Sequence, residues 1–294
     1  MKRPPPAVRA LALAELSGAY PHLRFAVRSA DGRQQGHDAG ARHPLAGTGK
    51  LVLACAVARL AARDPGLLGD RLTLTGARRD AARSGTLRLM SGELTLTVDD
   101  ALTLIVGTGD ARCVLALLDH LRDRAYDVVG EARAHVAGLG LEDTEITGLE
   151  TDGRPEGGHP GDAGEGSSWG EGLRGVTTPS DLCTLLSALP ESVLGWMGAA
   201  FEPAGLASGL PGFGPRTVPH QTVAGWELLA DAGGLEDPDD PDDPRGWASV
   251  LVLPGAVVAA YLPARQADGT AVAPLQASTT LGALGLSVWQ EFHS

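Results

Sequence analysis

Two groups of predicted strands, one near each end of the chain, constrain its fold more than any other feature. Near the N-terminus, residues 23–28 alternate like a half-buried strand, and Asp31-Gly32 is a hairpin turn signal. A predicted helix closes the chain near 275–291. It is preceded by strand patterns at 217–230, 247–253 and 256–262. We therefore expect the two ends of the chain to meet in one antiparallel sheet.

The middle of the chain is dominated by helical patterns. These lie at 48–63, 98–104, 110–122, 126–138 and 179–188. The last of them opens with Thr178-Pro179-Ser180-Asp181, which is typical of a helix N-terminus. We therefore predict an α+β protein, a three-layer α/β/α sandwich. Its sheet subdomain would combine residues 1–46 and 206–294, and an all-helical subdomain at 47–205 would be inserted between them.

Charge and composition exclude several classes of partner. The chain has 294 residues and a formal net charge of −12, whereas nucleic acids and anionic membranes favour clustered Lys and Arg. The N-terminal apolar run ends at Glu15, too early for a secretory signal, and no later run is long enough to span a bilayer. We therefore expect a cytoplasmic protein with no nucleic-acid or membrane partner; the oligomeric state is left open.

Cysteine and histidine positions predict no metal or other cofactor. Cys55, Cys113 and Cys183 are odd in number and lie in apolar, helix-like segments, so we interpret them as small core residues. The histidines are scattered, without the spacing of a metal site. The acidic, proline-broken stretch at 236–244 fits no calcium-loop pattern and is interpreted as a solvated loop.

Lys50 is the residue most suggestive of chemistry. Apart from Lys2, it is the only lysine in a chain that otherwise uses arginine. A lysine is a compact ammonium whose pKa shifts readily on burial, which a guanidinium does not do. Lys50 stands at the start of an apolar helix, in Gly47-Thr48-Gly49-Lys50. A phosphate-binding loop would need Ser or Thr after the lysine, and Leu51 stands there instead.

Four segments in this order resemble the motifs of class A β-lactamases and penicillin-binding proteins, from about residue 20 to the end. Gly47-Thr48-Gly49-Lys50 resembles Ser-x-x-Lys, and Thr108-Gly109-Asp110 resembles Ser-Asp-Asn. Residues 147–150 resemble the entry to the omega loop, and Gln221-Thr222-Val223 resembles Lys-Thr-Gly. The resemblance implies a β-lactamase-like antiparallel sheet with an inserted helical subdomain and a glycine-rich, omega-like loop at 148–176.

The departures from these motifs bear on chemistry. In the family the serine forms an acyl-enzyme, but Gly47 has no side chain, and a helix turns the adjacent Thr48 about 100° away. Gln221 removes a cation that helps to hold a substrate carboxylate, and Val223 adds a branched side chain where glycine lets a ligand lie close. A carboxylated β-lactam is therefore not the expected substrate.

The remaining positions define a candidate acid–base cluster. The resemblance implies that Thr108 keeps a proton-relaying hydroxyl, that Asp110 lies within reach of Lys50, and that Glu150 occupies the place of the general base. Two carboxylates beside an amine push their pKa values apart, which suits proton transfer. Equally, Lys50 and Asp110 could form a structural ion pair that fills an inactive pocket. Glu150 would then be an ordinary loop residue.

Two further residues are candidates for ligand contact. His220 precedes Gln221, but on an alternating strand its side chain could equally face the opposite layer. Trp169 is the one Trp, Tyr or Phe residue in the glycine-rich loop.

Two functions from different classes follow. The first is a repurposed enzyme without an acyl intermediate, which uses Lys50, Glu150 and Asp110 on a small peptide- or acyl-like molecule, with room at Gly47 for a water or substrate atom. The second is a pseudoenzyme that binds a small ligand or a protein partner in the old active-site cleft.

Overall fold

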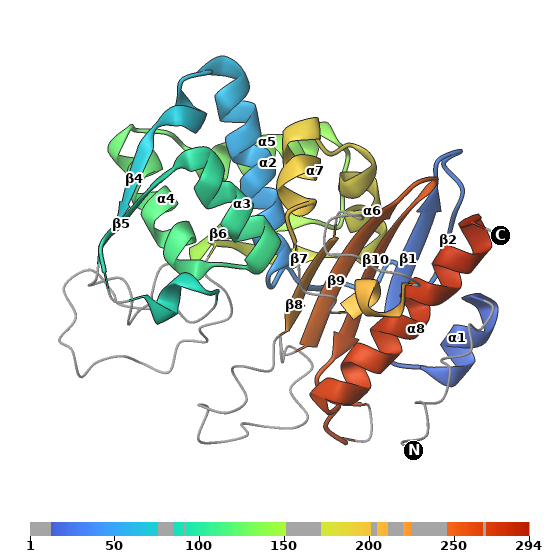
Figure 1. The fold of residues 1–294 in the computed structure, drawn as a ribbon. Coiled ribbons are helices and arrows are strands. Elements are labelled where there is room, and N and C mark those ends of the chain that lie inside the picture. Colours follow the sequence, from blue (N-terminus) through green and yellow to red (C-terminus); the bar gives the residue numbers. More distant parts are fainter. Residues whose placement is uncertain are drawn as a thin grey trace.

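A five-stranded antiparallel sheet joins the two ends of the chain, as the sequence predicts (Figure 1). Its order is β2-β1-β10-β9-β8. The strands are β1 (Arg24–Ser29), β2 (Gln34–His37), β8 (His220–Ala224), β9 (Gly246–Leu253) and β10 (Ala256–Pro263). The computed structural model describes residues 13–75, 85–90, 92–150, 172–200, 205–210, 220–224, 246–266 and 269–293.

The central strands are apolar because both faces of the sheet are covered. Every residue of β9 and β10 except Val252 and Pro263 is buried. The N-terminal strand β1 pairs with β10 in the register Phe25 opposite Ala260 and Val27 opposite Val258. A sheet covered on both sides is expected to have continuous apolar strands, since neither set of alternating side chains meets water.

Helices on either side complete the three layers. The closing helix α8 (Pro274–His293) and α1 (Leu13–Ala19) cover one face, and α6 (Pro179–Ser187) packs on β1 and β10 from the other. One core lies between α8 and the sheet, and a larger one joins the sheet to the helical part. The short helix η4 (Gly205–Gly209) lies directly against α8, where a Cβ at Gly209 would come 1.8 Å from the carbonyl oxygen of Gly282.

The helical part of the chain agrees with the predicted elements. The helices are α2 (Thr48–Arg63), α3 (Val98–Thr108), α4 (Ala111–Asp123), α5 (Val128–Gly138), α6 and α7 (Glu191–Met197). Side chains that accept a backbone N–H bond stand at the beginning of four of them. These N-caps are Thr97 for α3, Asp110 for α4, Asp127 for α5 and Thr178 for α6.

The inserted part is not purely helical, which differs from the expectation. It contains a two-stranded sheet of β4 (Arg71–Leu74) and β5 (Leu94–Thr97). It also contains β6 (Glu145–Glu150) and β7 (Gly172–Thr177), which form a three-stranded sheet with β3 (His43–Pro44) from just before the insertion. These strands have two to six residues. Such short segments carry too little periodicity for a sequence pattern to reveal them.

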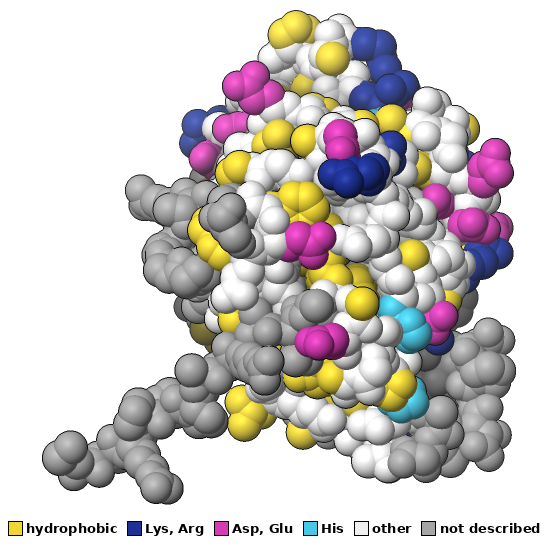
Figure 2. Space-filling model, turned by 90° about the vertical axis from the view of Figure 1, so that its right-hand side faces the viewer, with side chains coloured by type: hydrophobic (Ala, Val, Ile, Leu, Met, Phe, Trp, Pro, Cys, Tyr) yellow, Lys and Arg dark blue, Asp and Glu magenta, His cyan; other side chains and the backbone are white. Residues whose placement is uncertain are grey.

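The glycine-rich segment predicted as a loop at 148–176 begins and ends in strands. Residues 148–150 belong to β6 and 172–176 to β7, and the two strands pair antiparallel. Trp169 and the acidic stretch 236–244 lie outside the described residues. On the face shown in Figure 2, basic and acidic side chains are interspersed with apolar ones.

Candidate functional site around Lys50

The first turn of α2 places Lys50 in the interior. Its side chain is buried, with 4% of the residue exposed, and its Nζ donates a hydrogen bond to the carbonyl oxygen of Gly109 over 2.6 Å. Ala46, two residues before the helix, has a positive φ of 44°, a conformation that costs a non-glycine residue about 1–3 kcal/mol and persists only where the surroundings impose it. Gly47 is the buried N-cap residue of α2 and provides no side-chain cap.

The hydroxyl of Thr48, the residue after Gly47, bonds to the backbone. Thr48 is buried, and its Oγ1 donates to the carbonyl oxygen of Leu45 in the preceding turn. The Thr48 hydroxyl is thus engaged with the backbone that precedes α2. Gly49 allows α2 to approach β7, because a Cβ there would lie 2.4 Å from the carbonyl oxygen of Leu173.

The junction between α3 and α4 lies opposite Lys50 and is built from the second predicted motif. Gly109 ends α3 in the left-handed conformation, with φ 67°. The Thr108 hydroxyl donates to the carbonyl oxygen of Leu104 in its own helix, over 2.8 Å. The Thr108 hydroxyl, which the resemblance implies to be a proton relay, therefore donates its hydrogen bond within α3.

Asp110 holds backbone segments together at this junction. Its carboxylate is fully buried and accepts two backbone N–H bonds, from Cys113 at the start of α4 (3.2 Å) and from Leu87 (2.8 Å). Gly85 packs directly on it, since a Cβ at this position would lie 2.3 Å from the Asp110 Cα. Asp110 directly follows Gly109, which Lys50 contacts, and its carboxylate accepts hydrogen bonds from the backbone.

Arg112 is a part of the site that the sequence analysis missed. It is fully buried on α4 and donates to five carbonyl oxygens, at 2.9–3.2 Å. These belong to Leu74, Thr75, Leu87, Met90 and Gly92. Arg112 therefore connects both ends of the segment between β4 and β5 through hydrogen bonds to their carbonyl oxygens. The only signal in the sequence was a single charge within the apolar start of a helix.

Glu150 is placed near Lys50 by strand pairing. Glu150 ends β6 and pairs with Gly172 of β7. A Cβ built on Gly172 would lie 3.7 Å from the Lys50 Cγ, so Gly172 lies against the lysine side chain. Adjacent antiparallel partners have Cα atoms about 4.5–5.5 Å apart. The backbone of Glu150 is therefore one strand away from the residue that contacts Lys50.

The segment that resembles Lys-Thr-Gly lies on the edge strand β8. His220, Gln221, Thr222 and Val223 pair with Leu251, Val250, Ser249 and Ala248 of β9. Helix α3, which carries Thr108, contacts β8. Contacts between α2 and α3 and between α3 and β8 therefore bring the segments that resemble Ser-x-x-Lys, Ser-Asp-Asn and Lys-Thr-Gly onto adjoining elements.

Other properties of the described residues bear on ligands. No group of three His, Cys, Asp or Glu side chains among them is arranged to hold a metal ion. No helix in the described ranges is long and apolar enough to cross a membrane. The three cysteines are buried and free, as predicted, and burial raises the pKa of the Cys55 and Cys183 thiols to about 12.

Comparison with known proteins identifies similar folds. A family model described as a β-lactamase enzyme family matches residues 9–240. A β-lactamase from Sphaerobacter thermophilus is 19% identical, with 95% of each chain covered and a TM-score of 0.64. An ancestral class A β-lactamase is 22% identical, with 95% of this chain and 98% of that one covered and a TM-score of 0.63.

A penicillin-binding protein structure is similarly close. A mutant of PBP-A, in an acyl-enzyme complex with penicillin G, is 20% identical, with 98% and 99% of the two chains covered and a TM-score of 0.59. A comparison with curated protein sequences finds no match. At these identities the solved structures establish the fold, and the family model spans most of the chain.

Proposed function

The chain belongs to the β-lactamase enzyme family, and from this premise we propose that it binds a small molecule at the Lys50 site without forming an acyl-enzyme. The position that corresponds to the family's serine in the sequence resemblance is Gly47, which has no nucleophilic atom. The neighbouring Thr48 hydroxyl is buried and bonded to the backbone of Leu45. No alternative hydroxyl therefore stands next to Lys50 in the first turn of α2.

One observation carries this proposal: the polar groups around Lys50 bond to backbone. Thr108 donates to Leu104, and Asp110 accepts from Leu87 and Cys113. A catalytic acid or base must reach the proton that it transfers, at about 2.6–3.2 Å. Groups that hold helix ends and connections in place instead stabilise a fixed site, which favours binding over turnover.

The ligand that this site favours carries a carbonyl or anionic group. Lys50 brings a positive charge into a buried position. A buried charge interacts more strongly than one in water, because the surrounding dielectric is low. A small peptide- or acyl-like molecule has the groups that such a charge attracts.

A non-acylating acid–base enzyme is the second candidate, and the position of Glu150 favours it. Glu150 pairs with Gly172, which lies against Lys50. The backbone of Glu150 is one strand away from the residue that contacts Lys50, and a carboxylate in this region would activate a water directly, with Gly47 leaving room for a substrate atom. The two candidate functions differ in a measurable respect. Only an enzyme would consume more than one equivalent of the small molecule per protein molecule.

The experiment compares four purified proteins with a small-molecule extract of the organism that makes this chain. They are wild type, Lys50→Ala, Glu150→Gln and, as a control, Arg122→Ala, whose exposed side chain lies on the outside of α4. Untargeted mass spectrometry measures compounds that are depleted and compounds that remain bound after desalting. Binding predicts a retained compound that Lys50→Ala loses and Arg122→Ala keeps, with no depletion beyond one equivalent.

Other outcomes assign the protein differently. Depletion far beyond one equivalent, lost in both Lys50→Ala and Glu150→Gln, would establish the enzyme. If no compound is retained or depleted, the proposal of a small ligand is wrong, and a protein partner becomes the next candidate.

A further inference from the structure

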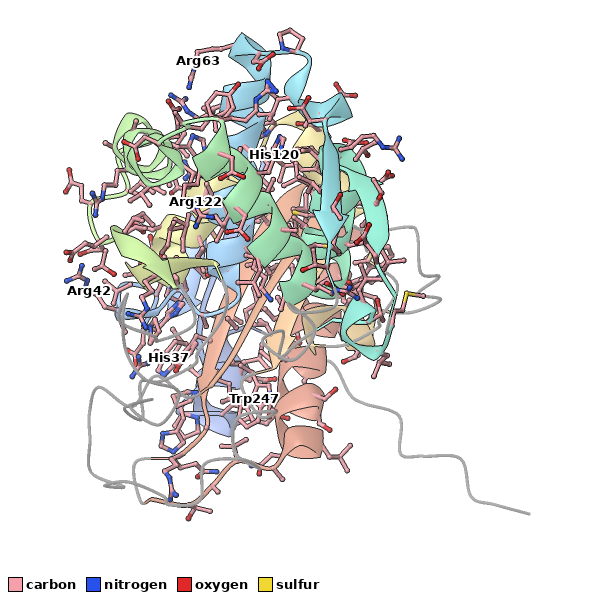
Figure 3. All side chains as sticks on the ribbon, turned by 90° about the vertical axis from the view of Figure 1, so that its left-hand side faces the viewer. His37, Arg42, Arg63, His120, Arg122 and Trp247 are labelled. Atoms are coloured by element: carbon pink, nitrogen blue, oxygen red, sulfur yellow. The ribbon has the colours of Figure 1, made fainter. Side chains whose placement is uncertain are left out.

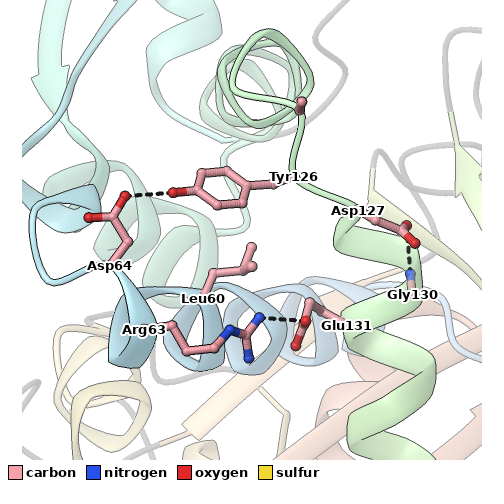
Figure 4. Close-up of a pocket in the computed structure, with 8 residues that line it drawn as sticks. Leu60, Arg63, Asp64, Tyr126, Asp127, Gly130 and Glu131 are labelled. Atoms are coloured by element: carbon pink, nitrogen blue, oxygen red, sulfur yellow. Dashed lines mark hydrogen bonds and ion pairs between the residues drawn. The ribbon is translucent and has the colours of Figure 1, made fainter.

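A concave site lies at the opposite end of α2 from Lys50. It is a cavity of about 410 Å³ between the last turn of α2, the α4–α5 connection and the first turn of α5 (Figure 4). Helix α2 has 16 residues, so its ends are about 24 Å apart at a rise of 1.5 Å per residue. Figure 3 shows Arg63 at this outer end, away from Trp247 on the central sheet. The cavity is therefore separate from the Lys50 site.

The walls of the cavity combine an apolar floor with an aromatic side chain. Leu60 of α2 is buried beneath it, and Tyr126 lines one side. The Tyr126 hydroxyl donates to Asp64 Oδ2 over 2.6 Å, which fixes the ring. Ala125, just before Tyr126, adopts a positive φ of 59°. An apolar stem could lie on Leu60 and the ring, since ligand sites typically combine such surfaces with a few placed polar groups.

The charges around the cavity favour a cation. Asp64, Asp127 and Glu131 line it together with one cation, Arg63. The Arg63 guanidinium is held by Glu131, and Arg124, which neighbours the cavity, is held by Asp64 and Asp70. An anionic ligand would have to compete with the protein's own carboxylates for both arginines.

One carboxylate oxygen is available to a ligand. Asp127 accepts the Gly130 N–H at Oδ1 over 2.8 Å as the N-cap of α5, and the described residues supply no donor to its Oδ2. The absence of a side chain at residue 130 keeps this place open, because a Cβ on Gly130 would lie 2.2 Å from Asp127 Oδ2. An ammonium or guanidinium group could donate to that oxygen and form a charge-assisted hydrogen bond.

We propose that this cavity binds a small organic cation, with an ammonium or guanidinium group at Asp127 and an apolar stem against Leu60 and Tyr126. A bare metal ion fits less well, because the described residues offer no set of three protein ligands. The Arg124 guanidinium lies over one face of the Tyr126 ring, 5.9 Å from its centroid, so the opposite face is the one that would attract the ligand's cation. This site is independent of the proposed function of the Lys50 region.

The test uses 1,4-diaminobutane as the probe, with 1,4-butanediol and succinate as neutral and anionic comparisons. Isothermal titration at low salt is combined with hydrogen exchange over residues 126–131. The proposal expects saturable binding of the diamine, slower exchange in this segment, and no binding of the diol or succinate. Tighter binding of succinate, or binding of Mg²⁺ that displaces the diamine, would overturn it.

Two variants and a matched control make the test specific. Asp127→Asn keeps a capping side chain for α5 but removes the charge, and should weaken diamine binding at least fivefold. Gly130→Ala changes no charge and fills the space at Asp127 Oδ2, with a similar loss expected. Asp123→Asn removes one negative charge, as Asp127→Asn does, but from the exposed end of α4. It should change the affinity for the diamine less than twofold. An equal effect of Asp123→Asn, or no binding to wild type, contradicts the proposal.

Discussion

Lys50 Nζ donates to the carbonyl oxygen of Gly109 over 2.6 Å, which joins the first turn of α2 to the junction of α3 and α4. Next to this junction, Asp110 connects the start of α4 to Leu87. The lysine and the aspartate that resemble catalytic residues thus both connect backbone segments. Their contributions to stability and to function are separable by substitution.

Asp110→Ala should destabilise the protein more than Lys50→Met. Alanine removes the cap of α4 and leaves the partly buried Leu87 N–H without its acceptor, so we expect the free energy of unfolding to fall by about 2–4 kcal/mol. Methionine fills the volume of Lys50 but leaves the Gly109 carbonyl oxygen without its donor, which should lower the free energy of unfolding by about 1–2 kcal/mol. Urea denaturation measures both; a larger effect of Lys50→Met would show that Lys50 is the structural centre.

Gly47→Ser should fold without restoring β-lactam hydrolysis. Gly47 is an N-cap without a side-chain bond, where serine is tolerated and stabilises by a few tenths of a kcal/mol. We expect no hydrolysis because Asp110, Gln221 and Val223 still stand where the family's motifs have Asn, Lys and Gly. Melting temperature and nitrocefin hydrolysis measure the two effects, with wild type as the reference. Rapid nitrocefin turnover by the variant would mean that the remaining groups are catalytically competent.

Arg112→Met should be among the most destabilising single changes in the helical part. It deprives five carbonyl oxygens of their donor, and the expected loss is about 3–5 kcal/mol in the free energy of unfolding. Arg122→Met, on the exposed side of the same helix, should change stability by about 0.5 kcal/mol or less. Similar losses in the free energy of unfolding of the two variants would show that the hydrogen bonds of Arg112 do not stabilise the connection between β4 and β5.

His43 should make stability depend on pH between about 4 and 6.5. It is buried and stacked on Tyr261 with ring centroids 4.5 Å apart, and burial lowers the pKa of its imidazole from 6.5 to about 4. Between these values the unfolded chain binds the proton and the folded protein does not. Stability is therefore fully present above pH 6.5 and is lost as the pH falls toward 4, by about 2–3 kcal/mol.

The variant His43→Phe isolates this contribution. Phenylalanine keeps a ring against Tyr261 but does not titrate, so the stability of the variant should fall less than that of wild type between pH 7 and pH 4.5. Urea denaturation at several pH values gives the difference between the two curves. Parallel curves would show that another group causes the pH dependence.

Sequence periodicity predicted the long elements well, because their pattern is local. The helix predicted at 48–63 has those bounds, and the strands predicted at 247–253 and 256–262 differ by one residue at an end. The prediction that the two ends share one sheet is confirmed by the pairing of β1 with β10. Each of these depends on an apolar pattern several residues long and on the turns that bound it.

Only the tertiary structure decided what the candidate site residues bind. The partners of Lys50 and Arg112 are backbone carbonyls 59 residues and 20–38 residues away along the chain. A backbone carbonyl is present at every position, so no residue type marks the one that a buried cation will contact. The sequence by itself determined which elements form and that Gly47 carries no nucleophile. Packing decided that Asp110, predicted as a reactive carboxylate, is the cap of a helix, because a buried carboxylate is stabilised by whichever N–H groups the fold brings to it.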